Sequence, residues 1–179
     1  MTTHNHNAAT TGRKGERILK EYLQNRGFSL LNKKSEFEEH GMSLKGRKRF
    51  PSPYDDGTFL SDGFIPELGY IVEYKYGEKH GTTEEKIFFD LEKIRDRVYG
   101  DEYPLVYIFW GTPEEITSEN TKRCWARVFA EKAEKENLPV EVVFATTDNG
   151  LDKWIESKKF DYSDCRVTAA PIKGFGTIF

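Results

Sequence analysis

The sequence predicts one α/β domain, with a central mixed β-sheet flanked by helices. Patterns typical of helices alternate along the chain with patterns typical of strands, which favours an α/β arrangement. Residues 103–110 (YPLVYIFW) form a near-continuous apolar run, as in a strand buried on both faces. Segments 58–65 and 70–76 read as two strands joined by Pro-Glu-Leu-Gly, a link suited to a hairpin.

The amino-terminal part combines an arm, a helix and a long insertion. Residues 1–11 are polar and are expected to form a flexible arm. Apolar residues recur at helical spacing within 12–26, and Gly27 follows as a stop signal. A short strand is predicted at 28–31. Residues 32–57 show no clear period and contain two prolines, so we interpret them as a surface insertion with a binding role.

The remainder alternates helices with strands. Thr82 and Glu85 have the spacing of a capping box, which predicts a helix start. A long helix at 118–136, a strand at 140–145, a short helix at 151–157 and an irregular tail complete the expected order. We therefore expect residues 12–179 to form a single domain.

Composition limits the class of protein. The chain has 179 residues, 37% hydrophobic and 32% charged, which suits one globular domain. No apolar run approaches the roughly 20 residues of a membrane span, and the first residues lack the features of a secretion signal. Two cysteines without metal-ligand spacing favour reduced thiols in a cytoplasmic protein. A net charge of −3 argues against indiscriminate coating of nucleic acid.

The segment SDGFIPELGYIVEYKYG, residues 61–77, carries the candidate chemistry. Side chains alternate across a strand, so Glu73 and Lys75 share one face and Tyr74 takes the other. If residues 65 and 70 flank the turn, the pairing 64 with 71, 63 with 72 and 62 with 73 follows. Asp62 is then expected directly opposite Glu73, at about 5.5 Å between backbone positions.

Two opposed carboxylates favour a divalent cation between them. Like charges directly opposite on a sheet destabilise it, and Mg²⁺ is commonly held by one or two carboxylates plus substrate phosphate. We expect Asp62, Glu73 and the backbone carbonyl of Tyr74 to hold Mg²⁺, with Mn²⁺ able to replace it. Lys75 would orient the attacking water or neutralise charge that builds on a phosphate.

An Asp, a turn, and Glu-x-Lys on the next strand resemble the signature of the PD-(D/E)XK nuclease superfamily. The resemblance covers roughly residues 12–110, with Ser61 standing where the family name has proline. It implies a restriction-endonuclease-like core, magnesium-dependent DNA cleavage, and an extra acidic residue on the preceding helix, a position that Glu16 matches. It also implies groups next to the active site within 81–87.

Basic residues are candidates for contact with nucleic acid. The insertion carries the run KGRKR, and the helix after the hairpin carries a further lysine; the residues are Lys45, Arg47, Lys48, Arg49 and Lys86. Such cations bind phosphates. We expect double-stranded DNA as the partner, and a homodimer, because one active site cuts one strand and a two-fold pair cuts a duplex most simply.

Alternative interpretations stay open. Asp62, Glu73 and Lys75 are also compatible with a polar network on a solvated sheet face, and Glu16 with a surface carboxylate paired with Lys20. The basic run also suits a solvated loop. At the level of function, a type II restriction-like endonuclease competes with a structure-specific, repair or nicking nuclease on the same fold, and with a binding module that has lost catalysis.

Overall fold

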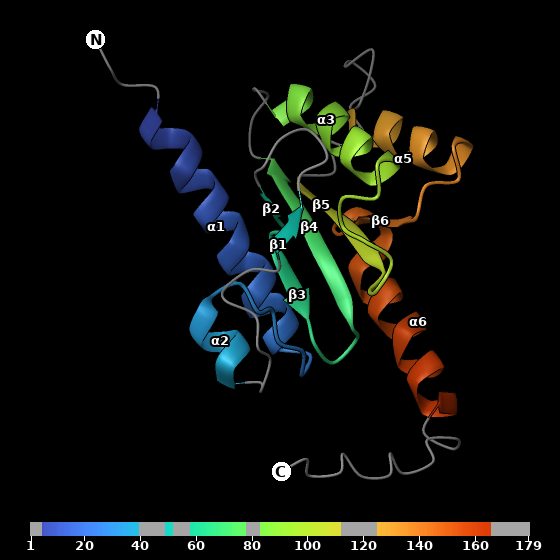
Figure 1. Ribbon diagram of the computed structural model, residues 1–179. Coiled ribbons are helices and arrows are strands. Elements are labelled where there is room, and N and C mark those ends of the chain that lie inside the picture. The colour runs from blue at the N-terminus through green and yellow to red at the C-terminus, as the bar shows by residue number, and fades with distance from the viewer. Residues whose placement is uncertain (1–4, 40–48, 52–57, 78–82, 112–124, 166–179) are drawn as a thin grey trace, which may run out of the picture.

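A computed structural model describes residues 5–39, 49–51, 58–77, 83–111 and 125–165 of the chain. It has three layers, with a central sheet between two pairs of helices (Figure 1). Helices α1 (Asn5–Gln24) and α6 (Gly150–Cys165) pack on one face of the sheet; α3 (Thr83–Arg95) and α5 (Trp125–Lys135) pack on the other. The expected α/β fold with a mixed, helix-flanked sheet is confirmed.

The sheet has four strands in the order β3-β4-β5-β6. These are β3 (Gly63–Ile65), β4 (Tyr70–Gly77), β5 (Leu105–Gly111) and β6 (Val140–Phe144). The β3–β4 pair is antiparallel, whereas β4–β5 and β5–β6 are parallel. The tight hairpin thus forms one edge of the sheet, and parallel crossovers through α3 and α5 build the rest.

Strict alternation along the strands divides the apolar side chains between two cores. Val72, Val106 and Ile108 join Leu19 of α1 and Leu151 of α6 in the first core. Ile71, Tyr107 and Phe109 join Leu91 of α3 and Phe129 of α5 in the second. Both faces of β4 and β5 are therefore buried, which explains their continuous apolar sequences.

Helix α1 ends where the sequence predicted. Gly27 has φ +81°, and the amide of Phe28 donates to the Leu23 carbonyl (3.0 Å) while that of Gly27 donates to Gln24 (3.0 Å). These two bonds form a Schellman motif, in which glycine adopts the left-handed conformation at least cost. The helix begins earlier than predicted, at Asn5, so the expectation of a flexible arm over residues 1–11 is wrong from Asn5 onward.

The expected continuous strand 58–65 is wrong. It is divided into β2 (Thr58–Leu60) and β3, with a bend at Ser61 and Asp62. The Ser61 hydroxyl donates to the Gly63 carbonyl (3.4 Å), a local bond that competes with the strand ladder. β2 pairs instead with β1 (Arg49–Pro51) in a separate two-stranded sheet.

Two further expectations need correction in the same region. Residues 28–31 do not form a strand; they contribute an isolated bridge between Leu31 and Phe64. The insertion contains regular structure, namely β1 and a short helix α2 (Lys34–Glu39), where Phe37 is fully buried. A single apolar residue among charged neighbours gives no periodic signal, although it anchors the helix.

The carboxyl-terminal elements follow the predicted order with shifted bounds. α3 begins at Thr83, and the expected cap Thr82 lies outside the described residues, as does the first part of the helix expected at 118–136. A 3-10 turn η1 (Thr147–Asn149) leads into α6, which is much longer than the predicted 151–157. Among the described helices, none is long and apolar enough to cross a membrane.

Candidate active site

Glu73 and Lys75 lie on β4 and face the α3–α5 layer. Their side chains are close, with 3.7 Å between the Lys75 Nζ and the Glu73 Oε2. Glu73 is 4% exposed. Tyr74 points to the opposite face and packs in the core beneath α1. The expectation that Glu73 and Lys75 share a face is confirmed.

Asp62 reaches the same strand in a different way from the one predicted. The register 63 with 72, 64 with 71 and 65 with 70 is confirmed. The ladder ends there, however, so Asp62 is not paired with Glu73. Instead, the Asp62 Oδ2 accepts a hydrogen bond from the Tyr74 amide at 2.8 Å. The Asp62 side chain thereby satisfies a β4 donor that β3 no longer reaches.

This bond also defines which edge of β4 faces Asp62. In an antiparallel pair, the N–H and C=O of one residue point to the same neighbouring strand. Because the Tyr74 amide points to Asp62, its carbonyl lies on that edge too. The Tyr74 carbonyl is therefore expected beside Asp62, at the point where β3 leaves the sheet.

Asp90 of α3 is a further member of the cluster, and sequence reasoning missed it. Its Oδ2 lies 3.0 Å from the Lys75 Nζ and its Oδ1 lies 2.6 Å from the Lys93 Nζ. The Tyr107 hydroxyl donates to Oδ2 at 2.7 Å. At 3% exposure, Asp90 is a buried carboxylate held by two ammonium groups and a phenol.

A signal for Asp90 exists in the sequence. Ile87, Leu91 and Ile94 recur at helical spacing within α3, and Asp90 falls on the same helical face. An acidic residue within an apolar stripe indicates a buried charge, which requires partners. Those partners come from β4 and β5, so only the tertiary structure identifies them.

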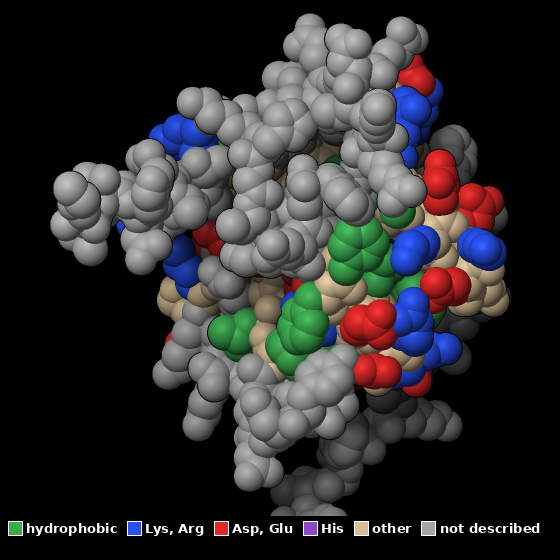
Figure 2. Space-filling model, turned by 90° about the horizontal axis from the view of Figure 1, so that it is seen from above, with side chains coloured by type: hydrophobic (Ala, Val, Ile, Leu, Met, Phe, Trp, Pro, Cys, Tyr) green, Lys and Arg blue, Asp and Glu red, His purple; other side chains and the backbone are tan. Residues whose placement is uncertain are grey.

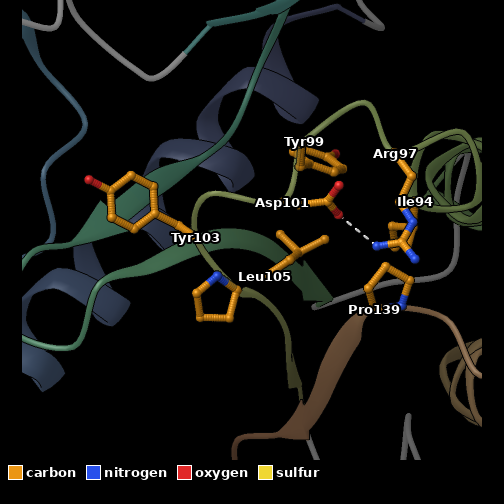
Figure 3. Close-up of a pocket in the computed structure, with 9 residues that line it drawn as sticks. Ile94, Arg97, Tyr99, Asp101, Tyr103, Leu105 and Pro139 are labelled. Atoms are coloured by element: carbon orange, nitrogen blue, oxygen red, sulfur yellow. Dashed lines mark hydrogen bonds and ion pairs between the residues drawn. The ribbon is translucent and has the colours of Figure 1, made fainter.

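Tyr99 contacts both the cluster and a cavity of about 240 Å³, whose lining Figure 3 shows. Its hydroxyl donates to the Glu73 Oε1 at 3.0 Å, while its ring lines the cavity at the amino end of β5. Arg97 and Asp101 form an ion pair at the cavity (2.7 Å). Burial and the nearby carboxylate of Glu73 raise the pKa of Tyr99, so the phenol remains a donor.

The two buried carboxylates have opposite electrostatic states. Burial, and then repulsion from Asp62, raises the pKa of Glu73 to about 8. Burial acts in the same direction on Asp90, but Lys75, Lys93 and the Tyr107 hydroxyl outweigh it and lower the pKa of Asp90. Burial disfavours the Lys75 cation, yet Asp90, Glu73 and Asp62 raise the pKa of Lys75. Lys75 is therefore charged at neutral pH.

Of the remaining predicted residues, the structure describes the side chain of Glu16 alone. Glu16 lies on α1, which covers the opposite face of β4. The helix approaches closely there, since a Cβ added at Gly15 would lie 2.5 Å from the Tyr76 Cβ. The catalytic role of Glu16 stays a prediction. Lys45, Arg47 and Lys48 lie outside the described residues, as do the side chains of Arg49 and Lys86.

Within the described residues, no three His, Cys, Asp or Glu side chains form a ready cage for a metal ion. Two carboxylates and a backbone carbonyl nevertheless suit Mg²⁺, which keeps several waters. No protein-family model, curated protein or solved structure matches this chain. The site therefore has to be interpreted from its own geometry.

Proposed function

We propose that this chain is a magnesium-dependent DNA endonuclease with a restriction-endonuclease-like core of the PD-(D/E)XK type. The observation that carries the proposal is Glu73. It is a buried carboxylate that lies on the same strand face as Lys75 (3.7 Å) and beside a second carboxylate, Asp62; burial, and then repulsion from Asp62, raises its pKa to about 8. Carboxylates perturbed by burial and by a like charge cluster at functional sites, and a cation beside Glu73 would offset both effects.

The donor set fits Mg²⁺. Asp62 Oδ2 is used by the Tyr74 amide, which leaves Oδ1 for the ion, and the Tyr74 carbonyl faces the same edge. Glu73 supplies a second carboxylate, held by the Tyr99 hydroxyl. When bound, Mg²⁺ (or Mn²⁺) polarises a phosphoryl oxygen and lowers the pKa of a bound water. Glu73 must release its proton for this binding.

Lys75 acts in the proposed reaction as a fixed cation. Its raised pKa rules it out as a general base at neutral pH, because it holds its proton there. Asp90 orients its ammonium at 3.0 Å. From this position Lys75 donates to the attacking water or to the phosphoryl oxygens as charge builds on them. Lys93 and Tyr107 in turn hold Asp90 in place.

The proposed substrate is DNA, and the proposed assembly is a homodimer. Each chain carries one proposed site, which would cut one phosphodiester, so two chains are needed to cut both strands of a duplex. The cations of residues 45–49 and Lys86 are proposed to bind the phosphates on either side. A repair or nicking nuclease would use the same chemistry on a different DNA structure.

Cleavage of plasmid DNA by Asp62→Ala and Glu73→Ala variants tests the proposal. In Mg²⁺ both should lose cleavage, while binding in Ca²⁺ persists and EDTA abolishes cutting by the unchanged protein. Glu131→Gln, at an exposed position of α5, is the matched control and should cut normally. Cleavage at the unchanged rate by either alanine variant would remove the metal site from consideration.

A further inference from the structure

An apolar surface lies next to the carboxylate cluster, on β2 and α3. Among the described residues, Phe89 and Leu60 are the exposed large hydrophobic side chains, at 49% and 45%. Of these two, Phe89 belongs to this surface, because Leu60 and Phe59 point to opposite faces of β2. Phe59 lies beside Phe89, with 6.2 Å between the ring centroids. Figure 2 shows apolar side chains among acidic and basic ones on this end of the molecule.

Lys93 connects this surface to the cluster. Its Nζ lies 5.1 Å from the centroid of Phe59 and 5.2 Å from that of Phe89, within range of cation–π attraction. The same ammonium lies 2.6 Å from Asp90, which holds Lys75. The two rings are therefore connected, through Lys93 and Asp90, to Lys75, the cation proposed to face the scissile phosphate.

Phe89 differs in exposure from its neighbour on α3. Its neighbour Phe88 packs against the core beneath α3, where Lys132 lies over its ring at 5.2 Å. Phe89 falls one residue further around the helix and turns outward. A solvated helix face normally carries polar residues, so a half-exposed phenylalanine beside a cationic group favours a binding role.

We propose that Phe89, backed by Phe59 and Lys93, stacks an unpaired nucleobase next to the scissile phosphate. This inference rests on the proposed nuclease function and deepens it. Every nucleobase has an aromatic face that can stack on a ring, without regard to sequence. In a continuous duplex those faces are hidden by neighbouring bases, whereas an unpaired nucleotide presents one.

The substrate is then DNA with a single-stranded or extrahelical nucleotide at the cleavage point. With the proposed divalent cation bound, the ion and the two lysines (+4) would exceed the three carboxylates of the cluster (−3), and this net positive charge supports a nucleotide over an apolar protein surface. Lys93 and Lys75 lie within the same contact network as the rings, which suits a base attached to a phosphate.

Binding of a 2-aminopurine-labelled oligonucleotide in Ca²⁺ tests the inference without needing cleavage. A single-stranded oligonucleotide and the same sequence in a continuous duplex are compared. For the unchanged protein we expect tighter binding of the single strand, with 2-aminopurine fluorescence quenched by stacking. Phe89→Ala should weaken single-strand binding roughly 5- to 150-fold and remove the quenching. Phe89→Trp should restore both.

Leu60→Ala is the matched control, because Leu60 is an equally exposed apolar residue that points to the opposite face of β2 from Phe59, and its loss should change binding little. Equal binding of single strand and duplex, with no effect of Phe89→Ala, would overturn the inference while leaving plasmid cleavage by the metal site intact. An oligomer that dissociates in Phe89→Ala with unchanged DNA binding would also overturn it, since the surface would then join protein chains. Plasmid cleavage that persists at the unchanged rate in Asp62→Ala or Glu73→Ala would instead refute the nuclease proposal.

Discussion

Replacing Glu73 with Gln should make the metal-free protein more stable at alkaline pH. Glutamine matches the size of a protonated glutamate and carries no charge. At about pH 4 the folded and the unfolded chain both hold the Glu73 proton, because the pKa is 4.5 in the unfolded chain and is raised to about 8 in the folded protein. At that pH the two proteins should therefore have similar free energies of unfolding.

The size of the effect follows from the pKa shift. Below pH about 4.5 the folded and unfolded chains both bind the Glu73 proton; between 4.5 and about 8 only the folded chain does. Stability therefore falls as pH rises through this window. At about 1.4 kcal/mol per pKa unit, the upper limit is about 5 kcal/mol at pH 9. Water that enters as Glu73 ionises reduces the observed loss.

Urea unfolding in EDTA at several values between about pH 4 and 9 measures this difference. The unchanged protein should lose stability across the window, and Glu73→Gln should lack that component. The groups around Glu73 are Asp62, Lys75, Asp90, Lys93 and Tyr99, and all are kept in the variant. Glu131→Gln is the exposed control. The reasoning would be refuted if the free energy of unfolding changed with pH in the same way in the unchanged protein and in Glu73→Gln.

Three further outcomes are expected. Lys75→Ala should slow single-turnover cleavage about 100- to 1,000-fold, as for loss of one stabilising donor, with Ca²⁺-supported DNA binding unchanged; normal cleavage would make Lys75 a structural ion-pair partner. Asp90→Asn should lower the free energy of unfolding by about 3–5 kcal/mol, because it leaves the buried ammonium groups poorly paired; urea unfolding measures this. Replacing the four cations of residues 45–49 with Ala should reduce the slope of log binding constant against log salt by roughly 0.9 for each lost phosphate contact, and an unchanged slope would identify a solvated loop.

Local chemistry made much of the hairpin predictable. A four-residue turn with proline and glycine fixes the register of its flanking strands, so Gly63, Phe64 and Ile65 pair as expected. Alternation then places Glu73 and Lys75 on one face. The predicted pairing of Asp62 with Glu73 was wrong because the break at Ser61 and Asp62 ends the β3–β4 ladder at Gly63. The carboxylate still arrives at β4, through a side-chain hydrogen bond rather than through strand pairing.

Features that depend on distant elements were not predictable. Asp90 becomes meaningful only when α3 packs over β4 and β5, which brings Lys75 and Tyr107 to it. Helix α6 exceeds its predicted length because tertiary contacts extend it. Its residue Lys158 pairs with Glu141 of β6, an interaction without a periodic signature in the sequence.

Glu141 shows what a structural carboxylate looks like in this protein. It accepts hydrogen bonds from Tyr70 (2.5 Å), Trp154 (2.6 Å) and Lys158 (2.9 Å). Burial raises its pKa, but these three donors outweigh burial and lower it. The negative charge of Glu141 is thus stabilised by donors within the fold and does not require a bound cation.

Glu73 has the opposite environment. Its hydrogen-bond donor is Tyr99, and the nearby ammonium of Lys75 lies closer to Asp90 (3.0 Å) than to Glu73 (3.7 Å). Asp90 also holds Lys93, so both cations of the cluster are turned toward Asp90. Three carboxylates, those of Asp62, Glu73 and Asp90, then share two ammonium groups, and one negative charge is left over. A proton on Glu73 or a divalent cation beside it completes the balance, and the two compete for the same position. By attracting both lysines, Asp90 keeps Glu73 available to a metal ion.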